Sequence, residues 1–337
     1  MSDEIISSSA RCAHDTLLAL RAACPVPSQF SPHADDVQGW LASELPLDAP
    51  TRERLGRAGF ARYAGRLYPD ATEADLRMLT ALFTWFFLVD DACDRNAPEE
   101  IRALRDGAVA VLRDGPRLRH PGLVGPLRRL LVSAWREPQR RMPAHWRLRF
   151  ADAVAHHLDG SWQEAVNKAT GHAPGVEEYV ELRRATSAAY VSYPLVEFIT
   201  GRPLPDAVYH HPQLGQLRAV GNDLLSWYND IASLDRDAAI SGGHNLVLAL
   251  AAAHHVPVST AIGLAAERWH ESMRRFVSLR ATAPSFGPAL DPAVTAHLDG
   301  VARAVRGTID WTMESARYAL AKEGPLPAAS GVGTPPF

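Results

Sequence analysis

An uncharged run of nine residues, 81–89, leads directly into the acidic segment 90–94, which reads Asp-Asp-Ala-Cys-Asp. Most residues of the run are bulky, and its three phenylalanines are Phe83, Phe86 and Phe87. A helix that is apolar on every side must be buried. The segment therefore predicts a helix in the interior of the fold that carries carboxylates at its C-terminal end.

Apolar residues recur at helical spacing almost throughout the chain, and no alternating β pattern of useful length occurs. Breaks in the helical pattern coincide with proline and glycine, as at residues 48–50, 96–98 and 201–203. We expect an all-α helical bundle, with helices over residues 34–45, 51–67, 72–93, 98–114, 122–137, 144–168, 176–200, 213–238, 244–254, 257–283 and 290–322.

The length of 337 residues allows two domains, but no Pro/Gly/Ser-rich linker divides the middle of the chain. We therefore expect one helical domain over residues 25–323. Residues 1–24 are expected to be an N-terminal extension, either a short helix or a disordered segment. The Pro/Gly/Ala/Ser-rich residues 324–337 are expected to form a flexible tail.

Composition excludes several classes of function. A formal net charge of -3 provides no broad basic surface, so we expect no nucleic-acid partner. Only Lys168 and Lys322 are lysines, and the remaining positive charge is arginine, which suits phosphate recognition.

The three cysteines have no metal-ligand spacing, and they cannot form a disulfide framework. A reducing cytoplasm is the expected compartment. The N-terminus begins acidic, unlike a signal peptide, and no run approaches the roughly 18 apolar residues of a membrane span. We therefore expect no stable membrane anchor.

The first acidic segment places Asp90 and Asp94 four residues apart, on one face of the predicted helix, with Asp91 beside them. The two carboxylates repel each other, and the negative end of the helix dipole repels both. Cations would remove this repulsion, and Mg²⁺ prefers a few carboxylates together with substrate phosphate. The alternative is a solvated helix end with Arg95 as a local partner.

The second polar segment places Asn222, Ser226 and Asp230 at steps of four residues. Each step drifts by about 40°, so the three oxygen-bearing side chains stay within an arc of about 80° on one helix. An amide, a hydroxyl and a carboxylate in a row could ligate one hard cation. The alternative is a polar stripe that faces water.

Together the two segments resemble the metal-binding motifs of class I terpene synthases of the bacterial type. Residues 90–94 resemble the aspartate-rich DDxxD motif, and the second segment resembles the Asn/Ser/Glu triad, with Asp230 in the acidic place. Other similar segments, in family order over residues 31–318, are Ser31-Pro32-His33 with Trp40, Arg183-Arg184-Ala185-Thr186, His244-Asn245-Leu246-Val247, Trp311 and Arg317-Tyr318.

The chain departs from the family pattern at three places. Asn229 stands where the family often has a basic residue that contacts diphosphate. Ala188, preceded by Ser187, stands where a helix-breaking glycine is expected. The segment between Arg184 and Asn222 is about two helical turns shorter than is usual in the family.

The resemblance implies a single-domain class I terpenoid synthase-like bundle around a central apolar cavity. There a linear isoprenyl diphosphate would be ionised and cyclised to a terpene hydrocarbon or alcohol. Three Mg²⁺ ions would be held by Asp90, Asp91, Asp94, Asn222, Ser226 and Asp230. Diphosphate would be bound by Arg183, Arg184, Arg317 and Tyr318, with Arg184 as the sensing arginine and Arg184, Arg317 and Tyr318 as the catalytic donors.

A carbocation needs a dry pocket whose walls do not react with it, and aromatic faces attract cations while excluding water. The predicted pocket wall consists of Phe83, Phe86, Phe87, Ser187, Ala188, Tyr190 and Trp311. For each aromatic residue, ordinary core packing is the alternative.

The family resemblance favours farnesyl diphosphate as the substrate, with geranylgeranyl diphosphate second. A homodimer is a further expectation from the family. Two other functions stay open at this point. One is a chain-elongating isoprenyl diphosphate synthase, although it would carry a second aspartate-rich motif in place of residues 222–230. The other is a non-catalytic helical protein that binds an isoprenoid.

Overall fold

The computed structural model describes residues 2–44, 47–239 and 244–315, and these contain helices and no β-strand. The all-α prediction is confirmed. The helices, in chain order, are α1 (Ser2–Ala23), α2 (Ala34–Glu44), α3 (Ala49–Ala58), α4 (Phe60–Leu67), α5 (Glu73–Cys93), α6 (Pro98–Asp114), α7 (Gly125–Arg141), α8 (Ala144–Thr170), α9 (Val176–Thr186), α10 (Ala189–Thr200), α11 (Asp206–Tyr209), α12 (Pro212–Ala238), α13 (Leu246–His254), α14 (Val258–Ala281) and α15 (Asp291–Glu314).

Helix α5 lies in the interior, as its uncharged sequence predicts. It packs against α2, α4, α7 and α8. Residues 78–86 are all buried, because this stretch has no charged side chain that would need solvent. Thr72 caps the N-terminus by accepting the backbone N–H of Asp75, and the helix ends at the acidic segment.

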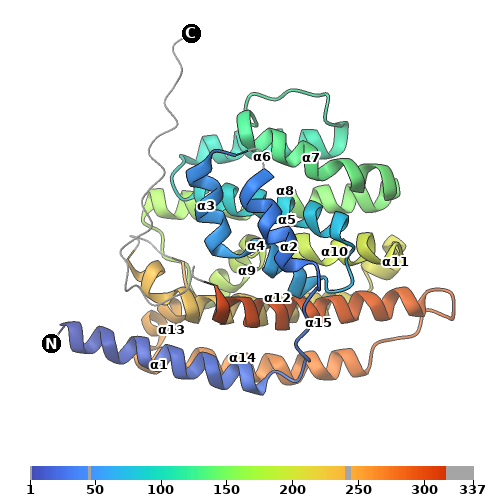
Figure 1. The fold of residues 1–337 in the computed structure, drawn as a ribbon. Helices are drawn as coiled ribbons and strands as arrows, with labels where there is room; N and C mark the ends of the chain where they lie inside the picture. The colour runs from blue at the N-terminus through green and yellow to red at the C-terminus, as the bar shows by residue number, and fades with distance from the viewer. Residues whose placement is uncertain (1, 45–46, 240–243, 316–337) are drawn as a thin grey trace, which may run out of the picture.

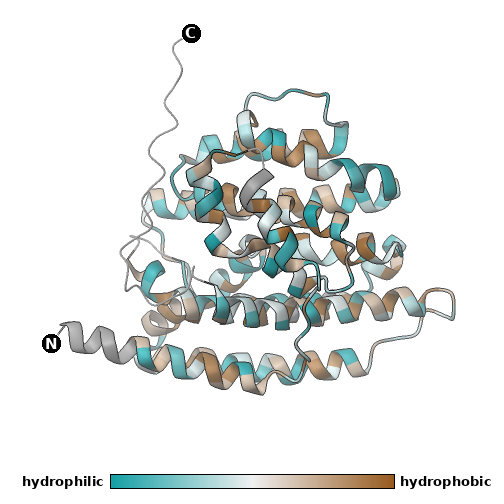
Figure 2. Cartoon of the chain, in the orientation of Figure 1, coloured by the Kyte–Doolittle hydropathy of each residue, from teal (hydrophilic) through white to brown (hydrophobic). Residues whose placement is uncertain are grey.

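The long C-terminal helices form one side of the molecule (Figure 1). Helix α12 packs against both α14 and α15, and α15 also packs against α4 and α10. Hydrophobic and hydrophilic residues interleave along the helices, as expected where each helix buries one face and exposes another (Figure 2).

Two helices that the periodicity predicts as continuous are broken. Predicted helix 51–67 divides into α3 and α4 at Gly59, which has a φ of 70° that glycine adopts without strain. Predicted helix 176–200 divides into α9 and α10 at Ala188, where φ is 59°. An alanine in this region is uncommon, and no periodicity signals it.

Residues 2–23, for which the sequence allows either a helix or disorder, form α1, which lies against α14 and α12 (Figure 1). The backbone carbonyl of Leu17 accepts a 3.1 Å hydrogen bond from the Tyr228 hydroxyl of α12. The predicted domain limits stay predictions, and the tail 324–337 lies outside the described residues.

No single helix in the described ranges is long and apolar enough to cross a membrane. Helices α13 and α14 reach that length and hydropathy only when taken together, and they are bent by 113°.

Candidate active site

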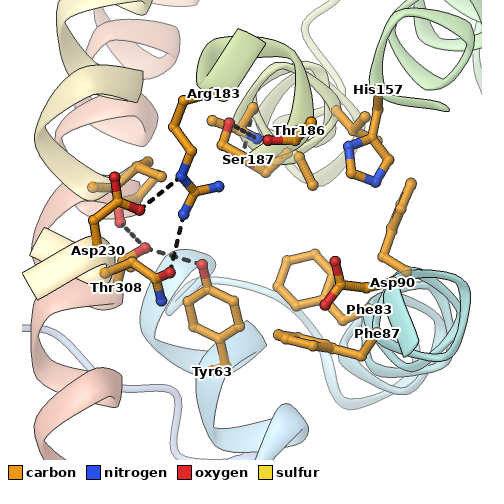
Figure 3. Close-up of a pocket in the computed structure, with 18 of the residues that line it drawn as sticks. Tyr63, Phe83, Phe87, Asp90, His157, Arg183, Thr186, Ser187, Asp230 and Thr308 are labelled. Carbon is orange, nitrogen blue, oxygen red and sulfur yellow. Dashed lines mark hydrogen bonds and ion pairs between the residues drawn. The ribbon is translucent and has the colours of Figure 1, made fainter. Parts of the chain in front are cut away.

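A cavity of about 210 Å³ opens between the C-terminal end of α5, the break between α9 and α10, and the helices α4, α8, α12 and α15. It contains residues from both acidic segments and from the aromatic part of α5 (Figure 3). Residues that lie far apart in the chain, such as Tyr63 and Thr308, meet there through a 3.0 Å hydrogen bond.

The end of α5 presents Asp90 and Asp94 to this cavity, whereas Asp91 is not among the residues that line it. The shared face follows from the four-residue spacing. Asp94 forms a 3.1 Å ion pair with Lys168 of α8, so one of the two lysines in this arginine-rich chain lies at the acidic motif. Both lining carboxylates are exposed and therefore accessible to ions.

The three polar residues of α12 lie along one side of the helix and are buried. The Asn222 Oδ1 atom accepts hydrogen bonds from the hydroxyl of Ser226 at 2.9 Å and from that of Ser187 at 2.7 Å. Asp230 lines the cavity together with Ser187, while Asn222 and Ser226 do not. The amide oxygen of the triad is thus held by protein hydroxyls, one of which belongs to the triad itself.

The Asp230 carboxylate is held from three directions. It accepts hydrogen bonds from the Tyr179 hydroxyl at 2.6 Å, from Arg183 Nε at 2.8 Å and from the backbone N–H of Leu246 at 3.2 Å. The amide of Asn245 also donates to the Asp230 carbonyl at 2.7 Å. The segment that begins at His244 therefore fixes the acidic end of the triad.

The two neighbouring arginines point to different places. Arg183 lines the cavity and also donates to Asn229 Oδ1 at 3.0 Å. Burial disfavours its charge, but the Asp230 carboxylate outweighs burial and raises the pKa of Arg183. Arg184 instead forms a bidentate pair with Asp223, at 2.7 Å from both Nε and Nη2, and it does not line the cavity.

One wall of the cavity is aromatic (Figure 3). Trp311 stacks on Tyr63 with 4.3 Å between ring centroids, and its ring lies 5.7 Å from that of Phe87. The Trp311 indole N–H donates to the Ala58 carbonyl at 3.0 Å, which orients the ring. Phe83 and Phe86 also line the cavity.

Tyr190, which the sequence predicts in the pocket wall, does not line this cavity. Its ring lies 5.9 Å from His156 and 6.3 Å from Tyr193, and it is not among the lining residues. The helix break explains this difference, because it resets the rotation of α10 relative to α9. Ser187 and Ala188, at the break itself, do line the cavity.

Several lining residues carried no recognisable signal in the sequence. Tyr63 and His157 belong to no motif, and their helices reach the cavity only through packing. Lys168 is conspicuous in the sequence as one of two lysines, but no motif predicts that it lines the cavity. Glu164 also lines the cavity, and burial raises its pKa to about 7. Arg317 and Tyr318 lie outside the described residues.

The donor set fits a hard cation. Among the described residues, no three histidine, cysteine, aspartate or glutamate side chains form a group that could hold a metal ion by themselves. The oxygens that face or adjoin the cavity instead include the carboxylates of Asp90, Asp94 and Asp230, an amide and a hydroxyl. All-oxygen sites of this kind, completed by substrate phosphate, are typical of Mg²⁺.

Comparison with known proteins agrees with this geometry. Residues 81–275 match the family model described as terpene synthase family 2, C-terminal metal binding. The chain is 30% identical over 321 residues to (-)-delta-cadinene synthase of Streptomyces clavuligerus, covering 92% of this chain and 96% of the relative. It is 27% identical over 307 residues to (+)-T-muurolol synthase ((2E,6E)-farnesyl diphosphate cyclizing) of Roseiflexus castenholzii. That match covers 89% of this chain and 93% of the relative.

Among solved structures, a variant of cucumene synthase superposes with a TM-score of 0.77 at 26% sequence identity. That superposition covers 86% of this chain and 99% of the other. These matches decide against a chain-elongating synthase and against a non-catalytic binding protein. The acidic end of α5, the polar side of α12 and the aromatic cavity between them thus belong to an enzyme, and the chain is a member of the class I terpene synthase family.

Proposed function

We propose that this terpene synthase ionises a linear isoprenyl diphosphate with the help of Mg²⁺ and cyclises the resulting cation. The observation that carries the proposal is the division of one cavity into two kinds of wall. Asp90, Asp94, Asp230 and Arg183 supply charge, while the stacked rings of Tyr63 and Trp311, with Phe83 and Phe87, supply an apolar surface.

The charged side suits a diphosphate group. Three Mg²⁺ ions, ligated by Asp90 and Asp94 on α5 and by Asn222, Ser226 and Asp230 on α12, would neutralise the leaving group as its C–O bond breaks. Arg183 is the arginine we assign to diphosphate binding, in place of the predicted Arg184, because its guanidinium faces the cavity. Arg317 and Tyr318 remain predicted contacts.

The apolar side suits the hydrocarbon part of the substrate. Aromatic faces attract a cation electrostatically, and the wall offers no nucleophile among Phe83, Phe87 and Trp311. The hydroxyl of Tyr63 is paired with Thr308 at 3.0 Å, so it does not present a free polar group to the cation. This arrangement protects a cation from early capture by water.

Farnesyl diphosphate is the favoured substrate, and geranylgeranyl diphosphate is second. The Roseiflexus relative is named for the cyclisation of farnesyl diphosphate, and its match covers 89% of this chain. The test is incubation with geranyl, farnesyl and geranylgeranyl diphosphates plus Mg²⁺. Released diphosphate would be measured by a coupled assay and terpene products by gas chromatography with mass spectrometry.

We expect the highest ratio of turnover number to Michaelis constant with farnesyl diphosphate and a sesquiterpene product. Chelation of Mg²⁺ with EDTA should abolish diphosphate release. Asp90→Ala and Asn222→Ala should each remove most activity while the helical circular dichroism signal stays unchanged. Wild-type activity in either variant would contradict the two-sided metal site, and turnover of none of the three diphosphates would contradict the proposed reaction.

A further inference from the structure

His157 is a buried histidine of α8 whose imidazole lies at the cavity (Figure 3). Its Nδ1 atom lies 3.2 Å from the backbone carbonyl oxygen of Ala185. A carbonyl oxygen only accepts hydrogen bonds, so Nδ1 must carry the proton. The neutral ring then has its lone pair on Nε2, the nitrogen on the opposite side from this hydrogen bond.

The position of this ring is tightly defined. Gly160, one turn further along α8, packs so closely on α9 that an added Cβ would lie 2.7 Å from Ala185 Cβ. The edge of the imidazole meets the ring of Phe86 with 5.4 Å between centroids and 74° between planes. Helix packing thus holds His157 against both the carbonyl that sets its tautomer and a wall of the cavity.

The ring is neutral under ordinary conditions. Burial, with smaller contributions from His156 and Arg183, lowers the pKa of His157 to about 4 despite the opposing hydrogen bond to Ala185. A neutral imidazole can accept a proton. Once charged in this environment, it would lose that proton readily to a stronger base.

The other basic groups at the cavity are engaged or differently placed. Asp94 is paired with Lys168, and Asp230 with Arg183 and Tyr179. Glu164 lies on the same helix as His157, two turns closer to Lys168, and burial raises its pKa to about 7. His244 is a second neutral imidazole at the cavity, but its Nε2 lies 3.3 Å from the Asn167 amide, and Lys168 acts on it electrostatically. His157 is therefore the neutral base that borders the aromatic wall, at Phe86.

We propose that His157 is the base that ends the reaction, by accepting a proton from the cyclised carbocation at Nε2. This assignment rests on the proposed function. The C–H bond on the carbon next to the cationic centre breaks, and its electron pair becomes the new C=C π bond. The proton bonds to Nε2, giving an imidazolium and a neutral olefin, and it passes to the released diphosphate as the product leaves.

Two variants separate this role from a structural one. His157→Phe keeps a ring against Phe86 but removes both nitrogens. His157→Asn keeps an N–H at the place of Nδ1, so it can still donate to the Ala185 carbonyl, but it has no basic nitrogen. Glu164→Gln serves as the competing-base control. For each protein, diphosphate release and the product profile are measured on the same farnesyl diphosphate reactions.

We expect diphosphate release to stay near the wild-type rate in His157→Asn, because C–O cleavage precedes proton loss. Formation of the main olefin should fall by about 10²-fold in both His157 variants, with other terpenes or alcohols taking its place. An unchanged product profile in His157→Asn would overturn the assignment, as would a wild-type main product that carries a hydroxyl group. A changed product profile in Glu164→Gln, with none in the His157 variants, would also overturn the assignment. Absence of diphosphate release from the wild type would instead refute the proposed function.

Discussion

Arg183 of α9 donates from Nε to Oδ1 of Asp230 on α12 at 2.8 Å. The same guanidinium donates to Asn229 at 3.0 Å, the position for which the family resemblance predicts a basic residue. A positive charge therefore stands beside the triad although α12 does not supply it. The side chain comes from a different helix, and its position depends on how α9 packs against α12.

Replacement of Arg183 should affect catalysis more than replacement of Arg184. A lost charge-assisted hydrogen bond to diphosphate costs about 1.5–3 kcal/mol, so we expect Arg183→Ala to lower the turnover number by roughly 10- to 150-fold. Arg184→Ala is the matched control. It leaves Asp223 buried without its partner, so its main effect should be a lower melting temperature. Loss of turnover in Arg184→Ala at unchanged stability would reverse the assignment.

Acid should destabilise the protein partly through His157. Its pKa is about 4 when folded against 6.5 when free, so between these values the unfolded chain binds a proton that the folded chain does not. Stability should fall as the pH drops from 6.5 to 4, with up to about 3 kcal/mol from this residue. The free energy of unfolding, measured with urea at about pH 7 and at about pH 4.5, gives most of this loss of stability.

The His157→Asn variant lacks this titration and should lose less stability over the same pH interval. Burial also lowers the pKa values of His244 and His297, and both remain in the variant, so the difference between the two proteins reports on His157. An equal acid-induced loss in wild type and variant would contradict a lowered His157 pKa.

Gly160 should tolerate no side chain. An added Cβ would lie 2.7 Å from Ala185 Cβ and 3.0 Å from Thr186 Cγ2, so Gly160→Ala should separate α8 from α9 and destabilise the protein by about 1–3 kcal/mol. Gly215→Ala on α12 is the control, because nothing lies within 4 Å of its added Cβ. There, helix propensity predicts a gain of about 1 kcal/mol. Equal unfolding free energies for the two variants would refute the close packing.

The break at Ala188 should be strained. An alanine in the left-handed region costs the folded state about 1–2 kcal/mol of backbone strain. Glycine removes this strain, but it makes the unfolded chain more flexible, which lowers stability by about 0.4–1 kcal/mol. Ala188→Gly should therefore stabilise the fold by at most about 1.6 kcal/mol. His255→Gly, at the other non-glycine residue with positive φ in the described ranges, should give a similar gain.

Only the Ala188 variant should alter the product profile, since Ala188 lines the cavity and His255 does not. Thermal unfolding and product analysis of the two variants test this together. A change of products in His255→Gly of the same size would show that the effect does not come from the cavity wall.

The parts of the site that depend on spacing within one helix can be predicted from the amino-acid sequence. The uncharged run before Asp90 predicted the buried helix α5, and four-residue steps predicted that Asp90 and Asp94 share a face and that Asn222 and Ser226 are adjacent. These relationships hold because about 3.6 residues per turn set the direction of each side chain relative to its helical neighbours.

Tertiary structure alone decided which of these faces meet. Arg183 and Arg184 are adjacent in sequence, and only the packing of α9 on α12 shows that the first turns toward the cavity and the second toward Asp223. Tyr63 reaches Trp311 from near the opposite end of the chain, and the left-handed Ala188 turns Tyr190 out of the wall. Helical periodicity carries no information about such contacts, because they depend on the relative rotation of helices that are distant in the chain.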